Sequence, residues 1–257
     1  MKSILVEFVI VVAGILVALG VDEWRRDRED LRIAEEHLAD VTAEVRQNLC
    51  TVQRIKVRAM GYKYSSLQTV LDFLNDPAAP AADEAALLQA FARSTANPRP
   101  WLVNNQYQAL QNSGNVRLVR RLDPELSLAG VYEGPRVLFG HVDRLQGRYP
   151  VVVHELIPAQ MQAKLSPLRS YARRVDATDA PEIVDAADLR QAIDKIRARR
   201  VELLALARNE SAVATANWYA LLRIKSDHET LLEQLKRWDR STQSVSDMLA
   251  ECAEPAK

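Results

Sequence analysis

The strongest constraint on this chain is an apolar run close to its N-terminus. Residues Ile4 to Val21 include one charged side chain, Glu7, and the remaining positions are apolar residues or glycine. At a helical rise of about 1.5 Å per residue, this run extends roughly 27 Å, which is close to the hydrocarbon thickness of a bilayer. The run therefore predicts a single transmembrane helix, residues 1–21, whose partner is the lipid bilayer.

A cleaved signal peptide is the main alternative to a retained anchor. Met1-Lys2-Ser3 fits a short basic segment ahead of the apolar run, and Ala18-Leu19-Gly20 fits a small-residue cleavage site. An acid inside the run suits a signal peptide poorly, however. The helical pattern also continues into Trp24, Arg25 and Arg26, which are residues typical of a membrane interface. We therefore favour a retained anchor with these three residues as interfacial contacts.

Glu7 lies on the same face of the predicted helix as two small residues. At about 100° per residue, Glu7, Gly14 and Ala18 fall within about 40° of one another. Small residues four apart let two helices approach closely, so this face favours a homo-oligomer. An acid in hydrocarbon is costly, and it snorkels to the interface, packs against another helix, or lines an ion or proton path. The residues alone leave these three interpretations open.

The composition of the rest of the chain predicts an all-α body. Only 8 glycines occur among 257 residues, and residues with high helix propensity are abundant. Apolar residues recur at spacings of three and four from Leu31 to Tyr62 and again from Leu221 to Leu249. We predict an elongated bundle in which a long C-terminal helix, Ser211 to Glu251, packs antiparallel on the helix leaving the membrane. Packing of these two apolar seams against a second copy fits the pattern equally well.

Helix breakers divide the body into three parts. Residues 22–76 form a predicted stalk helix that ends at a proline-rich stretch beginning at Asn75. Residues 77–185 form a middle helical region with loops, including a second break at Asn97-Pro98-Arg99-Pro100 and a helix stop at Gly114. Residues 186–257 form a C-terminal helical pair that completes the bundle.

Each apolar seam contains one polar residue. Asn48 in the first seam is predicted to fix helix register. His228 in the second is either a pH-sensitive contact or, as we favour, a buried histidine bonded to an acid on the facing helix. Cys252 continues the second seam, whereas Cys50 lies about half a turn off the first. This misfit counts against a disulfide between them, which stays a possible bond.

No motif in the sequence predicts catalysis. The four histidines are not spaced for a shared metal face, neither cysteine lies in a CxxC pair, and no phosphate-binding or nucleophile motif occurs. We assign no catalytic, cofactor-binding or metal-binding residue, and we expect no cofactor. Lys plus Arg equals Asp plus Glu, 34 against 34, which argues against nucleic acid as a partner. Four aromatic residues are interpreted as core rather than as a ligand pocket: Trp101, Tyr107, Tyr132 and Tyr149.

Two segments resemble a widespread family of uncharacterised bacterial single-span membrane proteins. The first covers residues 7–36, EFVIVVAGILVALGVDEWRRDREDLRIAEE. The matching positions there are Glu7, Gly14, Ala18, Leu19, Asp22, Trp24 and Arg28. The second runs from Gln106-Tyr107 to Leu110 and through Ser113-Gly114-Asn115-Val116-Arg117-Leu118. The resemblance implies a helix-rich protein anchored in a bacterial inner membrane, and it implies no activity.

The orientation of the body is predicted from two opposing indications. Four arginines between residues 25 and 32 follow the span, against Lys2 ahead of it, which favours a cytoplasmic body. Bacterial proteins with a short N-terminal tail and a large C-terminal domain more often export that domain, and a bond between the two cysteines would fit an oxidising compartment. We place the body in the periplasm.

The sequence thus supports three functional hypotheses. The first is a membrane-anchored helical scaffold or sensor-like module, not an enzyme, that self-associates through the Glu7, Gly14 and Ala18 face and its two seams, with a further protein partner left open. The second is an oligomeric ion-conducting or proton-conducting subunit that uses Glu7. The third is a ligand-binding or enzymatic helical domain that uses the region from Trp101 to Tyr149.

Overall fold

The computed structural model describes residues 2–76, 78, 80, 83–157, 161 and 184–253, with side chains from Ile10 onward. Within this part of the chain every regular element is a helix, as predicted. The α-helices are α1 (Lys2–Arg54), α2 (Met60–Asn75), α3 (Glu84–Ser94), α4 (Asn105–Asn112), α5 (Val116–Leu122), α6 (Leu128–Leu145), α7 (Tyr149–Leu156), α9 (Ala186–Ala198), α10 (Arg200–Gln234) and α11 (Val245–Ala253). A π-helical turn, Ile55–Ala59, joins α1 to α2, and a 3-10 turn, Lys236–Trp238, follows α10.

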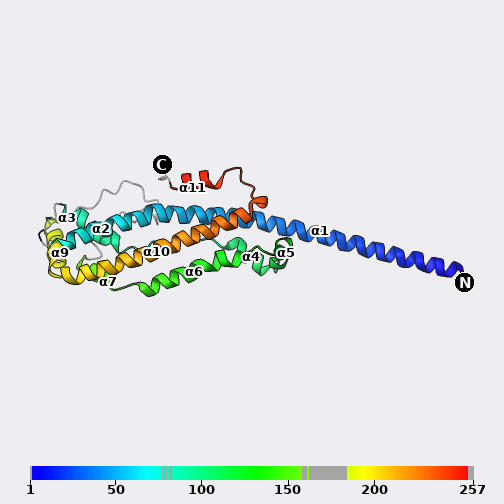
Figure 1. Ribbon diagram of the computed structural model, residues 1–257, viewed down its shortest axis with the longest axis horizontal. Coiled ribbons are helices and arrows are strands. Elements are labelled where there is room, and N and C mark those ends of the chain that lie inside the picture. Colours follow the sequence, from blue (N-terminus) through cyan, green and yellow to red (C-terminus); the bar gives the residue numbers. More distant parts are fainter. Residues whose placement is uncertain are drawn as a thin grey trace.

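The first helix combines two different environments along one axis. Its N-terminal part projects away from all other helices, and its C-terminal part forms one side of the body (Figure 1). Burial begins at Ala34 and recurs at Leu38, Val41 and Val45, each 0% exposed. The predicted stalk helix is therefore a rib of the bundle from residue 34 onward.

The predicted membrane span lies partly outside the described side chains, because its positions 4–9 precede Ile10. Among the residues that the structure does describe, no helix combines the length and the apolar character needed to cross a membrane.

The two apolar seams pack against each other within one chain. Helix α10 runs back along α1 and α2, and it buries Leu221, Ile224 and Leu231 against them (Figure 1). Helices α6 and α7 cover the other side of α10, while α3 and α9 close the end farthest from the N-terminus. The antiparallel bundle is thus the arrangement found. Most side chains of the two seams are buried within one chain, and Leu31 and Tyr62 at the ends of the first seam stay exposed.

The predicted C-terminal helix is too long. Helix α10 ends at Gln234, and residues 239–244 lead into α11, which turns back along α1. Ser244 caps α11, with its hydroxyl accepting from the Asp247 backbone nitrogen at 3.1 Å. The connection is also held from α1, because Arg46 binds the Asp239 carboxylate at 2.5 Å and donates to the Gln243 carbonyl at 2.9 Å. A Ser-x-x-Asp cap at 244–247 was the sequence signal for this break.

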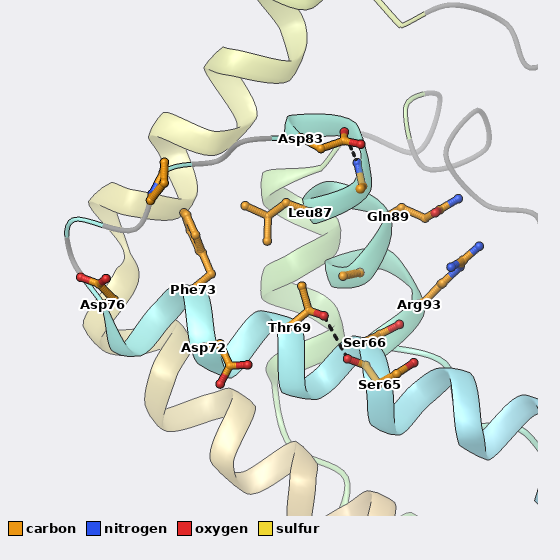
Figure 2. A pocket seen from close by; sticks show the side chains of 13 residues that line it. Ser65, Ser66, Thr69, Asp72, Phe73, Asp76, Asp83, Leu87, Gln89 and Arg93 are labelled. Atoms are coloured by element: carbon orange, nitrogen blue, oxygen red, sulfur yellow. Dashed lines mark hydrogen bonds between the residues drawn. The ribbon is translucent and has the colours of Figure 1, made fainter.

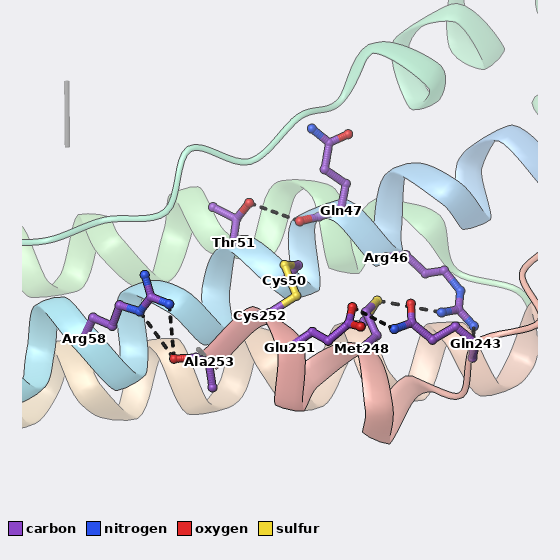
Figure 3. Close-up of a disulfide and its surroundings, with 10 residues drawn as sticks. All are labelled: Arg46, Gln47, Cys50, Thr51, Arg58, Gln243, Met248, Glu251, Cys252 and Ala253. Carbon is purple, nitrogen blue, oxygen red and sulfur yellow. Dashed lines mark hydrogen bonds between the residues drawn. A yellow bond between two sulfur atoms is a disulfide. The ribbon is translucent and has the colours of Figure 1, made fainter. Parts of the chain in front are cut away.

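The turn before α11 brings the two cysteines together. Cys50 and Cys252 form a disulfide with their Cα atoms 5.4 Å apart (Figure 3). Cys50 lies about 140° around α1 from Val45, so the seam that packs on α10 does not include it. The offset of Cys50 from the seam argued against the disulfide only if the C-terminal helix were continuous. Helix α11 instead reaches another face of α1, and Arg58 of the following π-helical turn donates to the Ala253 carbonyl.

Reduction of this disulfide is expected to destabilise the body. The bond closes a loop of 202 residues, and such crosslinks contribute about 2–5 kcal/mol by restricting the unfolded chain. Urea unfolding in detergent should shift to lower urea when dithiothreitol is added. The matched control, Cys50→Ser/Cys252→Ser, should not respond to the reductant. An unfolding midpoint of the native chain that ignores dithiothreitol would contradict a closed Cys50–Cys252 bond.

Candidate functional site

The most concentrated polar structure in the body surrounds a non-helical segment between α3 and α4. This linking segment, residues 95–104, contains Asn97-Pro98-Arg99-Pro100, which cannot form a helix because proline lacks the amide hydrogen. The segment is partly buried or exposed along its length, and its inward-facing backbone groups lack helical hydrogen-bond partners, so they need partners from elsewhere. Side chains of α1, α2 and α10 supply them.

Asn48 and Glu44 of α1 hold the end of the linking segment. The Asn48 side chain accepts from the Val103 backbone nitrogen and donates to the Val103 carbonyl, both at 2.7 Å. One turn earlier, the Glu44 carboxylate accepts from the Gln106 backbone nitrogen at 2.8 Å, at the start of α4. Asn48 is therefore buried, as predicted, but it binds a loop backbone rather than setting the register of paired helices.

A buried ion pair holds the beginning of the same segment. Lys63 of α2 lies 2.5 Å from the Glu210 carboxylate of α10 and donates to the Ala96 carbonyl at 2.6 Å. The two side chains are 1% and 3% exposed. Asn217 of α10 donates to the Asn97 side chain at 3.0 Å and to the Pro98 carbonyl at 3.2 Å. The segment is thus bound at both ends by groups without access to solvent.

Burial dominates the electrostatics of this cluster. Burial raises the pKa of Glu210, and the positive charge of Lys63 opposes that rise. Burial also raises the pKa of the Tyr149 phenol, which lies 2.7 Å from the Ser94 hydroxyl. Both hydroxyls and the ion pair are closed off from substrates, so we interpret the cluster as a structural support for the linking segment.

Lys63, Glu210 and Asn217 were not identified from the sequence. The π-helical turn at Ile55–Ala59 adds one residue to a turn of the helix and so rotates the buried face of α2. The predicted seam reached Tyr62, which is 53% exposed, whereas Lys63 takes the buried position. A charged residue between Met60 and Leu67, both buried, was the available signal.

His228 is buried, as predicted, but its partner differs from the prediction. The residue is 1% exposed, and its Nδ1 lies 2.8 Å from the Ile224 carbonyl of its own helix. This bond replaces the predicted acid on a facing helix, because the carbonyl one turn back is within reach of the ring. Burial lowers the pKa of His228.

The four aromatic residues do not form a common pocket. Trp101 is 87% exposed, whereas Tyr149 is fully buried in a different cluster. Tyr107 and Tyr132 stack with ring centroids 4.5 Å apart in the core near α1. The interpretation as core therefore holds for three of the four residues, and Trp101 is the exception.

An open groove of about 520 Å³ lies instead between α2 and α3. Ser65, Thr69 and Asp72 line one side, and Asp83 and Arg93 lie along the other (Figure 2). Two aspartates of the groove already accept hydrogen bonds from neighbouring residues. Asp83 caps α3 by accepting from the Ala86 backbone nitrogen at 2.9 Å, and Asp72 accepts from the Gln68 side chain at 2.7 Å. Among the described residues, no group of His, Cys, Asp and Glu is arranged to hold a metal ion.

The residues singled out near the anchor do not converge on a site either. Glu7 lies outside the described side chains, so its three interpretations stay open. Gly14 has no atom within 4 Å of an added Cβ, and Ala18 shares its exposed projection. Trp24 is 59% exposed with the Arg28 guanidinium 4.8 Å from its ring centroid, while Arg25 and Arg26 are exposed.

Comparison of the chain with protein-family models, with curated proteins and with solved structures found no match.

The buried ion pair gives a pH-dependent prediction. Lys63→Met leaves Glu210 as an uncompensated buried carboxylate, which costs about 3–5 kcal/mol at pH 7. The folded-state pKa of Glu210 lies above its unfolded value, so protonation stabilises the folded state at low pH, and this contribution is lost as the pH rises through the folded-state pKa. Urea unfolding should therefore show a smaller loss at pH 5 than at pH 7.5. In the control Lys63→Met/Glu210→Gln, the loss of unfolding free energy should depend less on pH. An equal loss in Lys63→Met at both pH values would refute a buried ion pair between Lys63 and Glu210.

The contribution of His228 to folding stability should depend on pH in the opposite direction. Its folded-state pKa is lowered by burial, so the unfolded chain binds the proton more readily. Stability from this group is present above the unfolded pKa of about 6.5 and falls by up to about 1.4 kcal/mol per unit as the pH drops below it. Urea unfolding between pH 7.5 and 5 should show a shallower dependence in His228→Gln, and no change in the exposed control His141→Gln. Identical slopes in all three proteins would rule out this role.

Proposed function

We propose that the chain is a single-span scaffold of a bacterial inner membrane, with its helical body held in the periplasm. The observation that carries this proposal is the projecting part of α1. Its apolar side chains are exposed on every side of the helix, among them Ile10 at 64%, Leu16 at 64% and Val17 at 66%. A helix that is apolar all round requires an apolar environment, and the body provides none for it.

The residues after this projection support the same assignment. Trp24 stands exposed three residues beyond Val21, where an interfacial aromatic residue would lie in the headgroup region. The disulfide between Cys50 and Cys252 supports a body in an oxidising compartment, since such bonds are rare in a reducing cytoplasm.

Self-association then depends on the anchor. Because α10 buries the seam of α1, the small-residue face of Gly14 and Ala18 is the surface of the predicted interface that stays open. Small side chains there would let the anchor helix of a second copy pack with its backbone close to the first. The scaffold role is supported by the body, whose buried polar groups bind its own linking segment.

Membrane anchoring is tested by flotation with liposomes after alkaline carbonate extraction. The full chain should float with the lipid. Leu16→Arg/Val17→Arg should largely abolish flotation, because each arginine at the centre of a span costs about 2.5–3.5 kcal/mol. The control Leu31→Arg alters an exposed residue of the same helix beyond the span and should float normally. Equal flotation of the double variant and the native chain would overturn the anchor.

The oligomeric interface has a separate test. Gly14→Ile/Ala18→Ile should lower the mass of the detergent-solubilised complex, measured by light scattering, because the two branched side chains prevent close approach. Ala13→Ile/Gly20→Ile adds the same bulk at positions about 120–140° around the helix from that face and should leave the mass unchanged. An unchanged mass in the first variant would mean that this face is not the interface.

A further inference from the structure

Helix α5 forms the end of the body nearest to the projecting part of α1 (Figure 1). Asn115, just before α5, contacts His37 of α1 at 3.0 Å, and Arg121, near the end of α5, donates to Asp27 of α1 at 2.9 Å. Since residue 27 precedes residue 37 along α1, α5 runs toward the anchor. Its last turn is therefore the part of the body closest to the predicted span.

The continuous helix fixes the height of this turn. Asp27 follows Val21 by six residues, which places it about 9 Å beyond the end of the span. The headgroup layer of each leaflet is roughly 5–8 Å thick, from a total of about 40–45 Å and a hydrocarbon core of about 30 Å. Arg120 lies in the last turn of α5, and Arg117 lies one turn earlier, about 4.5 Å farther from the span. Both arginine side chains are long enough to reach back toward the bilayer. Insertion of the anchor would thus bring them to the level of the lipid phosphates.

The chemistry of α5 fits that position. Leu118 and Val119 are buried and attach the helix to the body, whereas Arg117 and Arg120 are exposed. Within the described part of the chain these two arginines form no hydrogen bond or ion pair, while Arg121 is already paired with Asp27. A guanidinium group presents a planar fork of donors that binds phosphate oxygens at two points.

We propose that α5 docks on the membrane surface, with Arg117 and Arg120 binding the phosphate groups of phospholipids. This inference depends on the proposed anchoring. The balanced charge of the chain, 34 basic against 34 acidic residues, gives no long-range attraction to the membrane. The anchor makes a long-range attraction unnecessary, because tethering gives the contact between α5 and the membrane a high effective concentration. Docking holds the elongated body upright on the bilayer.

Amide hydrogen exchange of the full chain tests this contact. The protein is compared in nanodiscs of phosphatidylcholine and phosphatidylglycerol and in maltoside micelles, which lack phosphate. Exchange over residues 115–122 should be roughly tenfold slower in nanodiscs, the effect of about one charge-assisted hydrogen bond. Arg117→Gln/Arg120→Gln should remove this slowing. The control Arg136→Gln/Arg190→Gln, which changes two exposed arginines elsewhere in the body, should retain it.

The outcomes separate this contact from the anchor itself. A chain that fails to enter nanodiscs refutes the anchoring. A chain that enters them but exchanges at the same rate over 115–122 as in micelles refutes the docking alone. Slowing that persists in Arg117→Gln/Arg120→Gln also refutes it, since the two arginines would not be the contacts. Slowing in phosphatidylcholine discs as well as in mixed discs supports recognition of the phosphate that both lipids share.

Discussion

The fold depends on the continuity of α1, a single helix that passes from an exposed apolar rod into the core of the bundle. Its first part has apolar side chains on all sides, and its later part keeps them on one stripe that begins at Ala34. No loop or hinge separates the two in the described chain. Any force or tilt on the rod therefore reaches the body directly, and the position of α5 follows from the geometry of α1.

The second constraint is the linking segment, which is held by buried polar side chains of α1, α2 and α10. Its two prolines prevent a helix, so its carbonyl and amide groups are bound by Asn48, Lys63 and Asn217. Lys63 in turn requires Glu210, because a lone ammonium group in this core would be strongly destabilised. The buried pair of Lys63 and Glu210 thus serves to hold one irregular segment in place.

Much of the fold followed from the sequence because apolar spacing is a local property. The spacing predicted the long first helix, the antiparallel α10 and the burial of Asn48 and His228. Two irregularities could not be read from it: the π-helical turn, which rotates the face of α2 by a residue, and the return of α11, which depends on contacts from Arg46. Apart from Asn48, the candidate site was missed because its contacts join residues that are 33 to 147 positions apart in the chain.

Spin-label accessibility along α1 shows whether this helix carries a membrane span directly into the body. Single nitroxide labels at successive positions from Ile10 to Leu31 are compared for collision with oxygen and with a water-soluble nickel complex in liposomes. If α1 spans the bilayer, collisions with oxygen should dominate up to Val21 and collisions with the nickel complex should dominate beyond Asp22. Uniform access of the nickel complex from Ile10 to Leu31 would contradict it.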